Sequence, residues 1–196
     1  MRNLWRLFPG VSGVARSLRL LAVPGLLAFA SGCNSSNAPN YKSGVGEKAA
    51  DAAACVTPEE SERLADQVLQ LVNLERASAG IGPVTINAQL DDVASDYACR
   101  MIEDVFFGHY DPLTGRGPGE RAVAGKYLFY NLGENLAAGQ ETPAEVVGVW
   151  MDSPAHREVI LGRAWTQAGV AVRFGGEYGI YWVLELADPV IRHARR

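Results

Sequence analysis

The sequence predicts an α+β domain in which helices pack on an antiparallel sheet. Helical periodicity dominates residues 57–162, whereas runs rich in β-branched and aromatic residues come at the end of the chain. A length of 196 residues favours one domain, and 48% hydrophobic with 20% charged residues is ordinary globular composition. These values exclude a mainly disordered chain, a collagen and a coiled coil.

The first helix is predicted to begin at Thr57-Pro58-Glu59-Glu60, with Thr57 as N-cap, Pro at the first helical position and Glu closing a capping box. Gly80 ends it. Its apolar stripe is expected to comprise Leu64, Val68, Leu71, Val72 and, at the next position, Glu75.

A second helix is expected to follow Asn87. Its buried face should be formed by Leu90, Val93, Ala94, Tyr97, Ala98 and Met101. Residues 106–120 hold four glycines and two prolines, which predicts a long irregular loop of the kind that is usually functional or mobile.

The remaining elements alternate turn signals with periodic runs. Thr142 repeats the capping-box device and opens a third helix through about Met151, and Ser153-Pro154 begins a short fourth helix that ends at Gly162. Residues 168–174 and 179–186 read as the strands of a hairpin, and residues 126–131 as a further strand.

The first 33 residues have the layout of a secretory signal: four arginines, an eleven-residue apolar run from Leu20 to Ala30, and small residues before Cys33. This run is shorter than the roughly 20 residues that cross a bilayer. The ending resembles the bacterial lipobox, which implies a signal peptide over 1–32, lipidation of Cys33 and membrane anchoring. Asn34, where Asp would signal inner-membrane retention, favours the outer membrane. Ordinary cleavage with a free Cys33, or an uncleaved anchor, are the alternatives.

Three cysteines are an odd number for an exported protein. If Cys33 carries lipid, Cys55 and Cys99 remain as a pair, and their disulfide would close a loop of about 45 residues, worth on the order of 4 kcal/mol. Two buried thiols are the alternative. Residues 33–56 are expected to be a flexible tether, 57–190 the domain, and 191–196 a charged tail.

The first 32 residues hold four basic and no acidic side chains, so their removal lowers the formal charge from −4 to −8. A domain this acidic is a poor candidate for binding nucleic acid or anionic lipid through bulk charge.

Two histidines and one glutamate stand beside turn-forming residues: His109 in the glycine-rich loop, His156 in the short fourth helix, and Glu134 in Gly133-Glu134-Asn135. Such a set could hold a divalent metal with an open coordination position, or perform acid–base chemistry without one. Their spacing fixes no geometry, and the alternative is that they satisfy one another and the backbone.

Several segments form a set of motifs in a fixed order: Val72–Arg76 with Ala79-Gly80, Phe107–Pro112 with Gly115 and Arg121, Gly133–Ala137, Trp150–Arg157, Gly169–Ala171 and Tyr181-Trp182. Together these segments resemble the CAP superfamily, the cysteine-rich secretory, antigen 5 and pathogenesis-related domain, in its bacterial form. The resemblance covers about residues 64–187 and implies a three-layer α/β/α sandwich with a central cleft.

In eukaryotic relatives, two histidines and two glutamates line that cleft and can hold a divalent cation such as zinc. The resemblance carries His109, Glu134 and His156 onto three of these positions. At the fourth position Ser153 stands in place of a glutamate, with Asp152 adjacent, so a cation would have one carboxylate fewer. Asn135, Ser153 and Asp152 are further candidates for lining the cleft, and no organic cofactor is implied. A Ser153–His156 nucleophile pair is a weaker alternative, because Ser153 is better explained as an N-cap.

Three functions remain open, and the sequence does not decide whether the protein is an enzyme. The first is a membrane-anchored module whose cleft binds a small lipid or cell-envelope ligand, or a divalent cation. The second is a metal-assisted hydrolase acting on peptide or envelope polymer. The third is a protein-interaction module with a vestigial cleft.

Overall fold

The computed structural model describes residues 54–190. The predicted leader with Cys33, most of the predicted tether and the charged tail lie outside the described residues. The helices are α2 (Glu60–Ser78), α3 (Ala88–Glu103), α4 (Pro118–Ala124), α5 (Pro143–Asp152) and α6 (Pro154–Ile160), and the strands are β1 (Thr85–Ile86), β2 (Phe129–Ala138), β3 (Gln167–Gly175) and β4 (Gly179–Pro189). No helix within this range is long and apolar enough to span a bilayer.

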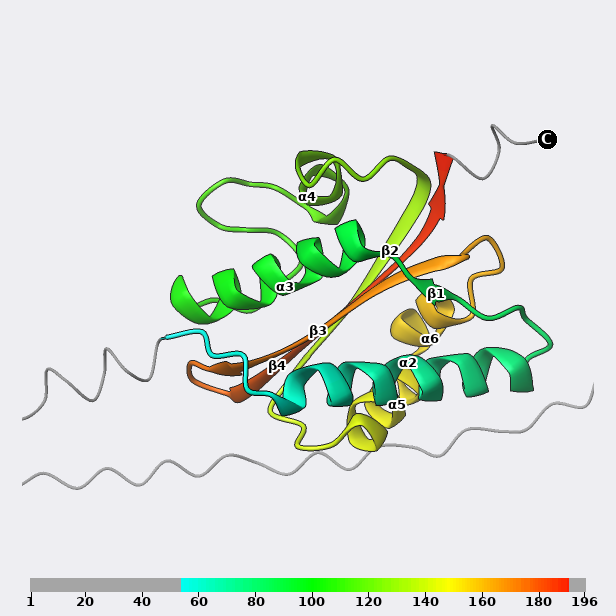
Figure 1. The fold of residues 1–196 in the computed structure, drawn as a ribbon, viewed down its shortest axis with the longest axis horizontal. Coiled ribbons are helices and arrows are strands. Elements are labelled where there is room, and N and C mark those ends of the chain that lie inside the picture. The colour runs from blue at the N-terminus through cyan, green and yellow to red at the C-terminus, as the bar shows by residue number, and fades with distance from the viewer. Residues whose placement is uncertain (1–53, 191–196) are drawn as a thin grey trace, which may run out of the picture. The chain divides into compact units, whose positions relative to one another are not determined.

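The four strands form one mixed sheet in the order β1-β3-β4-β2. Strands β3 and β4 form the predicted hairpin, β2 runs antiparallel to β4, and the two-residue β1 pairs in parallel with the start of β3. Helices α2, α5 and α6 cover one face and α3 and α4 the other (Figure 1). The expected α+β sandwich of three layers is therefore confirmed.

Alternation along the strands divides the core between the two faces of the sheet. On β4, Trp182 and Leu184 have opposite orientations to Tyr181 and Val183, which lie against α3. Trp150 of α5 is fully buried on the first face, where its indole Nε1 donates to the Leu136 carbonyl at 3.0 Å. The polar end of this large side chain is thus satisfied within an apolar layer.

Helix α3 confirms the prediction made from its apolar periodicity. Asn87 is its N-cap, with the side-chain oxygen accepting from the backbone N–H groups of Gln89 and Leu90 at 3.0 and 3.2 Å. All six residues expected on its inner face are buried, and Ile102 joins them.

The start of α2 differs from the prediction. The helix begins at Glu60, and its N-cap position is occupied by Glu59, which makes no side-chain cap bond, instead of Thr57. The buried face of α2 also differs at its C-terminal end, where Arg76 is buried in place of the predicted Glu75. The Arg76 side chain donates to four backbone carbonyls, those of Gly82, Ile160, Gly162 and Trp165, at 2.7 to 3.2 Å.

Two boundaries in the middle of the chain were also predicted wrongly. The irregular segment stops at Gly117, where Pro118 opens α4, so the last residues of the expected loop are helical. The strand expected at 126–131 begins at Phe129 and continues to Ala138. Its pairing with β4 thus places the Gly-Glu-Asn segment in the middle of an edge strand of the sheet.

Cys55 and Cys99 form the expected disulfide, with their Cα atoms 5.1 Å apart. The adjacent Val56 makes an isolated antiparallel bridge to Phe174 at the end of β3. Cys55 and Val56, which the sequence assigned to the tether, are therefore attached to the domain.

Candidate functional site

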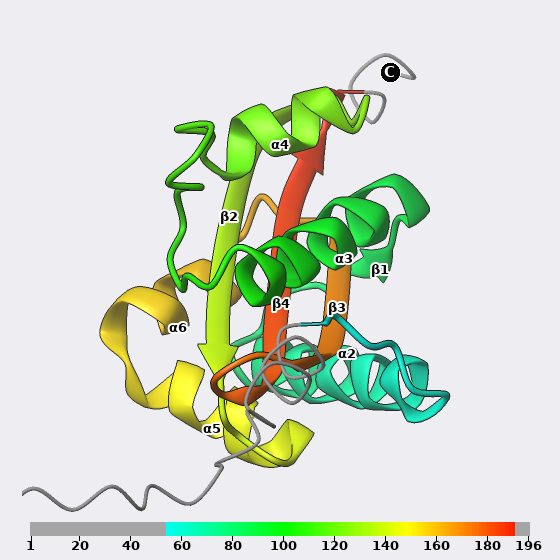
Figure 2. The same ribbon diagram turned by 90° about the vertical axis from the view of Figure 1, so that its left-hand side faces the viewer.

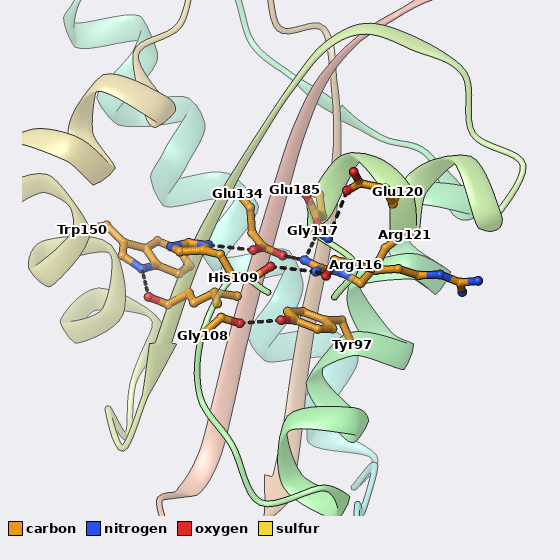
Figure 3. A network of polar contacts seen from close by, with 11 residues as sticks. Tyr97, Gly108, His109, Arg116, Gly117, Glu120, Arg121, Glu134, Trp150 and Glu185 are labelled. Atoms are coloured by element: carbon orange, nitrogen blue, oxygen red, sulfur yellow. Dashed lines mark hydrogen bonds and ion pairs between the residues drawn. The ribbon is translucent and has the colours of Figure 1, made fainter. Parts of the chain in front are cut away.

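Glu134 lies in the middle of β2 and points to the face covered by α3 and α4. Its carboxylate is only 1% exposed, and each oxygen has a partner from a different segment. Oε1 lies 2.7 Å from His109 Nδ1 in the glycine-rich loop, and Oε2 accepts from Arg121 Nη2 in α4 (Figure 3). The structure therefore brings together His109 and Glu134, two of the three residues predicted to form the site.

Arg121 holds this loop against the sheet. Besides its bond to Glu134, the guanidinium donates through Nη1 to the carbonyls of His109 and Arg116, at 2.8 and 3.2 Å. Its central carbon lies 3.2 Å from the centre of the Tyr97 ring, a cation–π contact (Figure 3). One buried side chain thus fixes both the backbone and the acidic partner of His109.

The His109 side chain is 45% exposed, although the carboxylate beneath it is buried. A second contact fixes the loop from α3, where Tyr97 Oη donates to the Gly108 carbonyl at 2.5 Å. Burial raises the pKa of Tyr97 to about 12, so the hydroxyl remains a donor at neutral pH. The His109 imidazole is therefore held by the buried Glu134 carboxylate on one side and is accessible to solvent on the other.

Glu185 of β4 is directly opposite Glu134 in the antiparallel ladder. Its side chain has no exposed surface, and Arg121 Nη2 is 3.8 Å from Oε1. Within residues 54–190 neither oxygen has a hydrogen-bond partner. Burial raises the pKa of Glu185 well above its usual range, the Glu134 carboxylate raises it further, and Arg121 opposes both effects. Burial and the neighbouring carboxylate therefore both favour the uncharged form of Glu185 in the folded protein.

Asn135 faces the opposite side of β2 from Glu134, where its Nδ2 donates to the His156 carbonyl at 3.0 Å. The remaining polar atoms here, Asn135 Oδ1 and His156 Nδ1, are buried and have no partner in the described chain. Burial lowers the pKa of His156, and the proximity of His109 lowers it further. His156 is therefore uncharged at neutral pH. It lies close enough to His109 for a charge on that ring to influence its pKa.

The other predicted residues lie at the junction of α5 and α6. Asp152 is exposed at the last residue of α5. Ser153 occupies the N-cap position of α6, as expected, but its side chain makes no cap bond. His156 Nδ1 is unpartnered, so a Ser153–His156 pair through this nitrogen is not formed. Among the described residues, no three His, Cys, Asp or Glu side chains are grouped so that they could hold a metal ion.

Sequence reasoning missed the parts of the site that stabilise it. Arg121 was named only as part of the family resemblance, and Tyr97 was predicted only as a core residue. Glu185 was not predicted to have any role. The signal for Glu185 was present: one acid inside the apolar run Tyr181–Leu186. A charged residue within an otherwise buried strand needs a partner on a neighbouring element.

Comparisons with known proteins agree with this architecture. Residues 69–186, more than half of the chain, match the family described as the cysteine-rich secretory protein family, CAP. An uncharacterized protein of Bacillus subtilis, YkwD, is 36% identical over 104 residues, which are 53% of this chain and 40% of that protein. The uncharacterized membrane protein YlbC of the same organism is 31% identical over 107 residues, which are 54% of this chain and 30% of that protein. The chain thus spans less than half the length of either relative.

Solved structures show the same fold. An extracellular protein containing a SCP domain from Bacillus anthracis superposes with a TM-score of 0.59 at 26% identity, over 67% of this chain and 44% of that one. An outer surface protein from Borrelia burgdorferi also gives 0.59, at 23% identity, over 69% of this chain and 97% of that one. The second likeness, at this identity, concerns the fold alone.

Proposed function

This chain belongs to the cysteine-rich secretory protein (CAP) family, and from that premise we propose that it is an extracytoplasmic binding protein whose ligand contacts His109. One observation carries the proposal: a half-exposed imidazole is fixed on a buried carboxylate, which a buried arginine holds in turn. Preorganised polar groups of this kind reduce the entropy lost when a ligand binds.

An unpartnered atom close to His109 indicates the chemistry of the ligand. The uncharged His156 ring, which is close enough to His109 for that residue to lower its pKa, has an unsatisfied Nδ1 in the described chain. Buried polar atoms without partners are costly, so a ligand that supplies hydroxyl or amide N–H groups would gain by satisfying them. Sugars and peptides of the cell envelope carry such groups.

A divalent cation fits this arrangement poorly. Both Glu134 oxygens are already engaged, one by His109 and one by Arg121, and the guanidinium supplies a positive charge where a cation would bind. The cation that the family resemblance implies remains a prediction, and so does metal-assisted hydrolysis. We favour binding of an organic ligand at His109, because it leaves the contacts of Glu134 with His109 and Arg121 in place.

Export and anchoring are part of the proposal. The leader, its resemblance to a lipobox at Cys33, and the extracellular protein that contains a SCP domain support them. We propose that Cys33 carries the lipid and that the outer membrane is the site of anchoring. Incorporation of an alkyne-labelled fatty acid, lost in Cys33→Ala, would support this; label retained in that variant would contradict it.

Side-chain NMR of the three histidines tests the ligand site directly. We would titrate the chain with N,N′-diacetylchitobiose, with N-acetylalanine amide and with zinc chloride. The expected result is that a sugar or amide probe shifts His109 and His156 but not His193 in the tail, and that Glu134→Gln weakens the effect. If neither organic probe moves His109, or if zinc alone does so with high affinity, the proposed ligand class is wrong.

A further inference from the structure

The outer edge of β3 carries a second polar site, remote from His109. Strand β1 pairs only with Gln167 and Ala168, and the bridge to Val56 holds only Phe174. Between these pairings the edge passes between α2 and α3 (Figure 2). A pocket of about 280 Å³ opens there, lined by all three elements.

This edge is not a free slot for an added strand. Asp91 Oδ1 accepts from the Val170 N–H at 2.9 Å, and Arg173 Nη1 donates to the Val172 carbonyl at 2.9 Å. Side chains therefore already bond some of the backbone N–H and carbonyl groups along this edge, which discourages pairing with another strand. What remains is a pocket for a side chain or a small molecule.

The pocket is acidic. Glu62 and Asp66 from α2 and Asp91 from α3 line it, against the single positive charge of Arg173. Burial raises the pKa of Asp91, and the nearby carboxylates of Asp92 and Asp66 raise it further, while the Val170 bond and Arg173 lower it. Three carboxylates that face one cation leave an excess of negative charge, which a cationic ligand would neutralise.

A second, independent observation points to a ligand. Ser61, on the inner face of α2, lines the same pocket and is only 1% exposed, yet its Oγ has no hydrogen-bond partner in the part of the chain described. A buried hydroxyl without a partner is uncommon in a native protein. Its position beside the carboxylates provides an acceptor for the N–H groups of a cation.

We propose that this pocket binds a primary ammonium group on a short alkyl chain, as in the lysine side chain of a peptide or in a free alkyl diamine. Glu62, Asp66 and Ser61 would accept from the ammonium, while the alkyl chain would pack on Ala65 and the 43% exposed Ile86. An organic cation suits the pocket better than a metal ion, because no metal-binding group of acidic residues occurs in the described chain.

The test is a calorimetric titration of the chain with Nα-acetyl-lysine methylamide and, separately, with cadaverine. The matched norleucine analogue lacks the ammonium group and is expected not to bind. Asp66→Asn should weaken binding by about two- to fivefold, as expected for a partly exposed ion pair, and Ser61→Ala should weaken it as well. Arg173→Gln should tighten it, because it removes the competing cation.

Glu158→Gln on α6 is the matched control, since it removes the same charge from an exposed site away from the pocket. Preference for the lysine derivative over cadaverine would indicate a peptide source, and the reverse a free amine. The proposal is overturned if neither amine binds, if the norleucine analogue binds equally well, or if Asp66→Asn and Glu158→Gln have the same effect. Affinity that does not fall as the salt concentration is raised well above physiological strength would also contradict it, because this attraction is screened by ions.

Discussion

At the scale of single residues, Glu185 and Arg121 determine how Glu134 can behave. A guanidinium between two ionised carboxylates would leave one negative charge uncompensated inside the domain, and burial makes that state costly. A proton on Glu185, which its raised pKa favours, removes that charge. Glu134 is the residue that contacts and orients His109.

Replacing Glu185 by glutamine is expected to stabilise the protein increasingly as the pH rises. The folded-state pKa of Glu185 lies above its unfolded value, near 4.3. The stabilising effect of the protonated acid is therefore fully present below about pH 4 and is lost as the pH rises toward the folded-state pKa. Glutamine stays neutral throughout and avoids this loss.

Urea unfolding at pH 4, 6 and 8 measures the effect, with Glu158→Gln as an exposed control. The free energy of unfolding of Glu185→Gln, relative to wild type, should be lowest at pH 4 and highest at pH 8. A difference that does not change with pH would mean that Glu185 is ionised in the folded protein.

Residue identities alone could predict only part of this site. His109 and Glu134 were identifiable because each stands in a distinctive local motif. Arg121 and Glu185 were not, since their role depends on contacts between α4, β2 and β4 that no sequence spacing encodes. His156 was expected as a third candidate ligand for a cation; its Nδ1 is buried and has no partner among the described residues, and its role as a ligand stays a prediction.

At the scale of elements, two segments that share the pattern Thr-Pro-x-Glu fold differently. Both Thr57 and Thr142 precede a proline and lie three residues before a glutamate. At α5 the full capping box forms: Thr142 Oγ1 accepts from the Glu145 N–H at 3.2 Å, and the Glu145 carboxylate accepts from the Thr142 N–H at 3.0 Å. At α2 the helix starts later, and Thr57 does not cap it.

Thr142→Ala is therefore expected to cost about 1 kcal/mol of stability, the typical value of an N-cap side chain. Thr57→Ala should change the free energy of unfolding by much less, although both threonines begin a Thr-Pro-x-Glu pattern. Chemical denaturation of both variants against wild type tests this difference. Equal losses would show that Thr57 stabilises the start of α2 after all.

Most helices and the final hairpin were predictable because each has its own local signal. The apolar periodicity of α3 and the alternation in β3 and β4 are examples. Strand β2 was harder, because Gly133 and Asn135 interrupt the pattern typical of a strand, and its conformation depends on pairing with β4. Strand β1 has only two residues, both exposed, and no local signal distinguishes it from a loop.

At the scale of the whole molecule, the two candidate sites use different parts of one sandwich. The His109 site lies where the loop before α4 meets Glu134 on β2, and the acidic pocket lies at the outer edge of β3. They share no residue, so substitutions in one are expected to leave ligand binding at the other unchanged.

The disulfide attaches the start of the described chain to the sandwich. Cys55 is bonded to Cys99 of α3, 44 residues away, and the adjacent Val56 is bridged to Phe174 of β3. In the loop-entropy description, a loop of about this length stabilises the folded state by roughly 4 kcal/mol. Cys55 is close to the first residue that the structure describes. Part of the stability lost on removing the disulfide can therefore be confined to local unfolding of the segment before α2.

The double substitution Cys55→Ser and Cys99→Ser is accordingly expected to cost about 2–4 kcal/mol while the sandwich persists. Two measurements separate local from global effects: chemical denaturation for the whole domain, and amide exchange for the Val56 and Phe174 N–H groups, which bond to each other's carbonyls at 2.8 and 2.9 Å. Exchange at these two amides should accelerate more than exchange in α3 or β4. Uniform acceleration would show that the bond supports the whole sandwich, and unchanged stability would show that the Val56 bridge suffices without it.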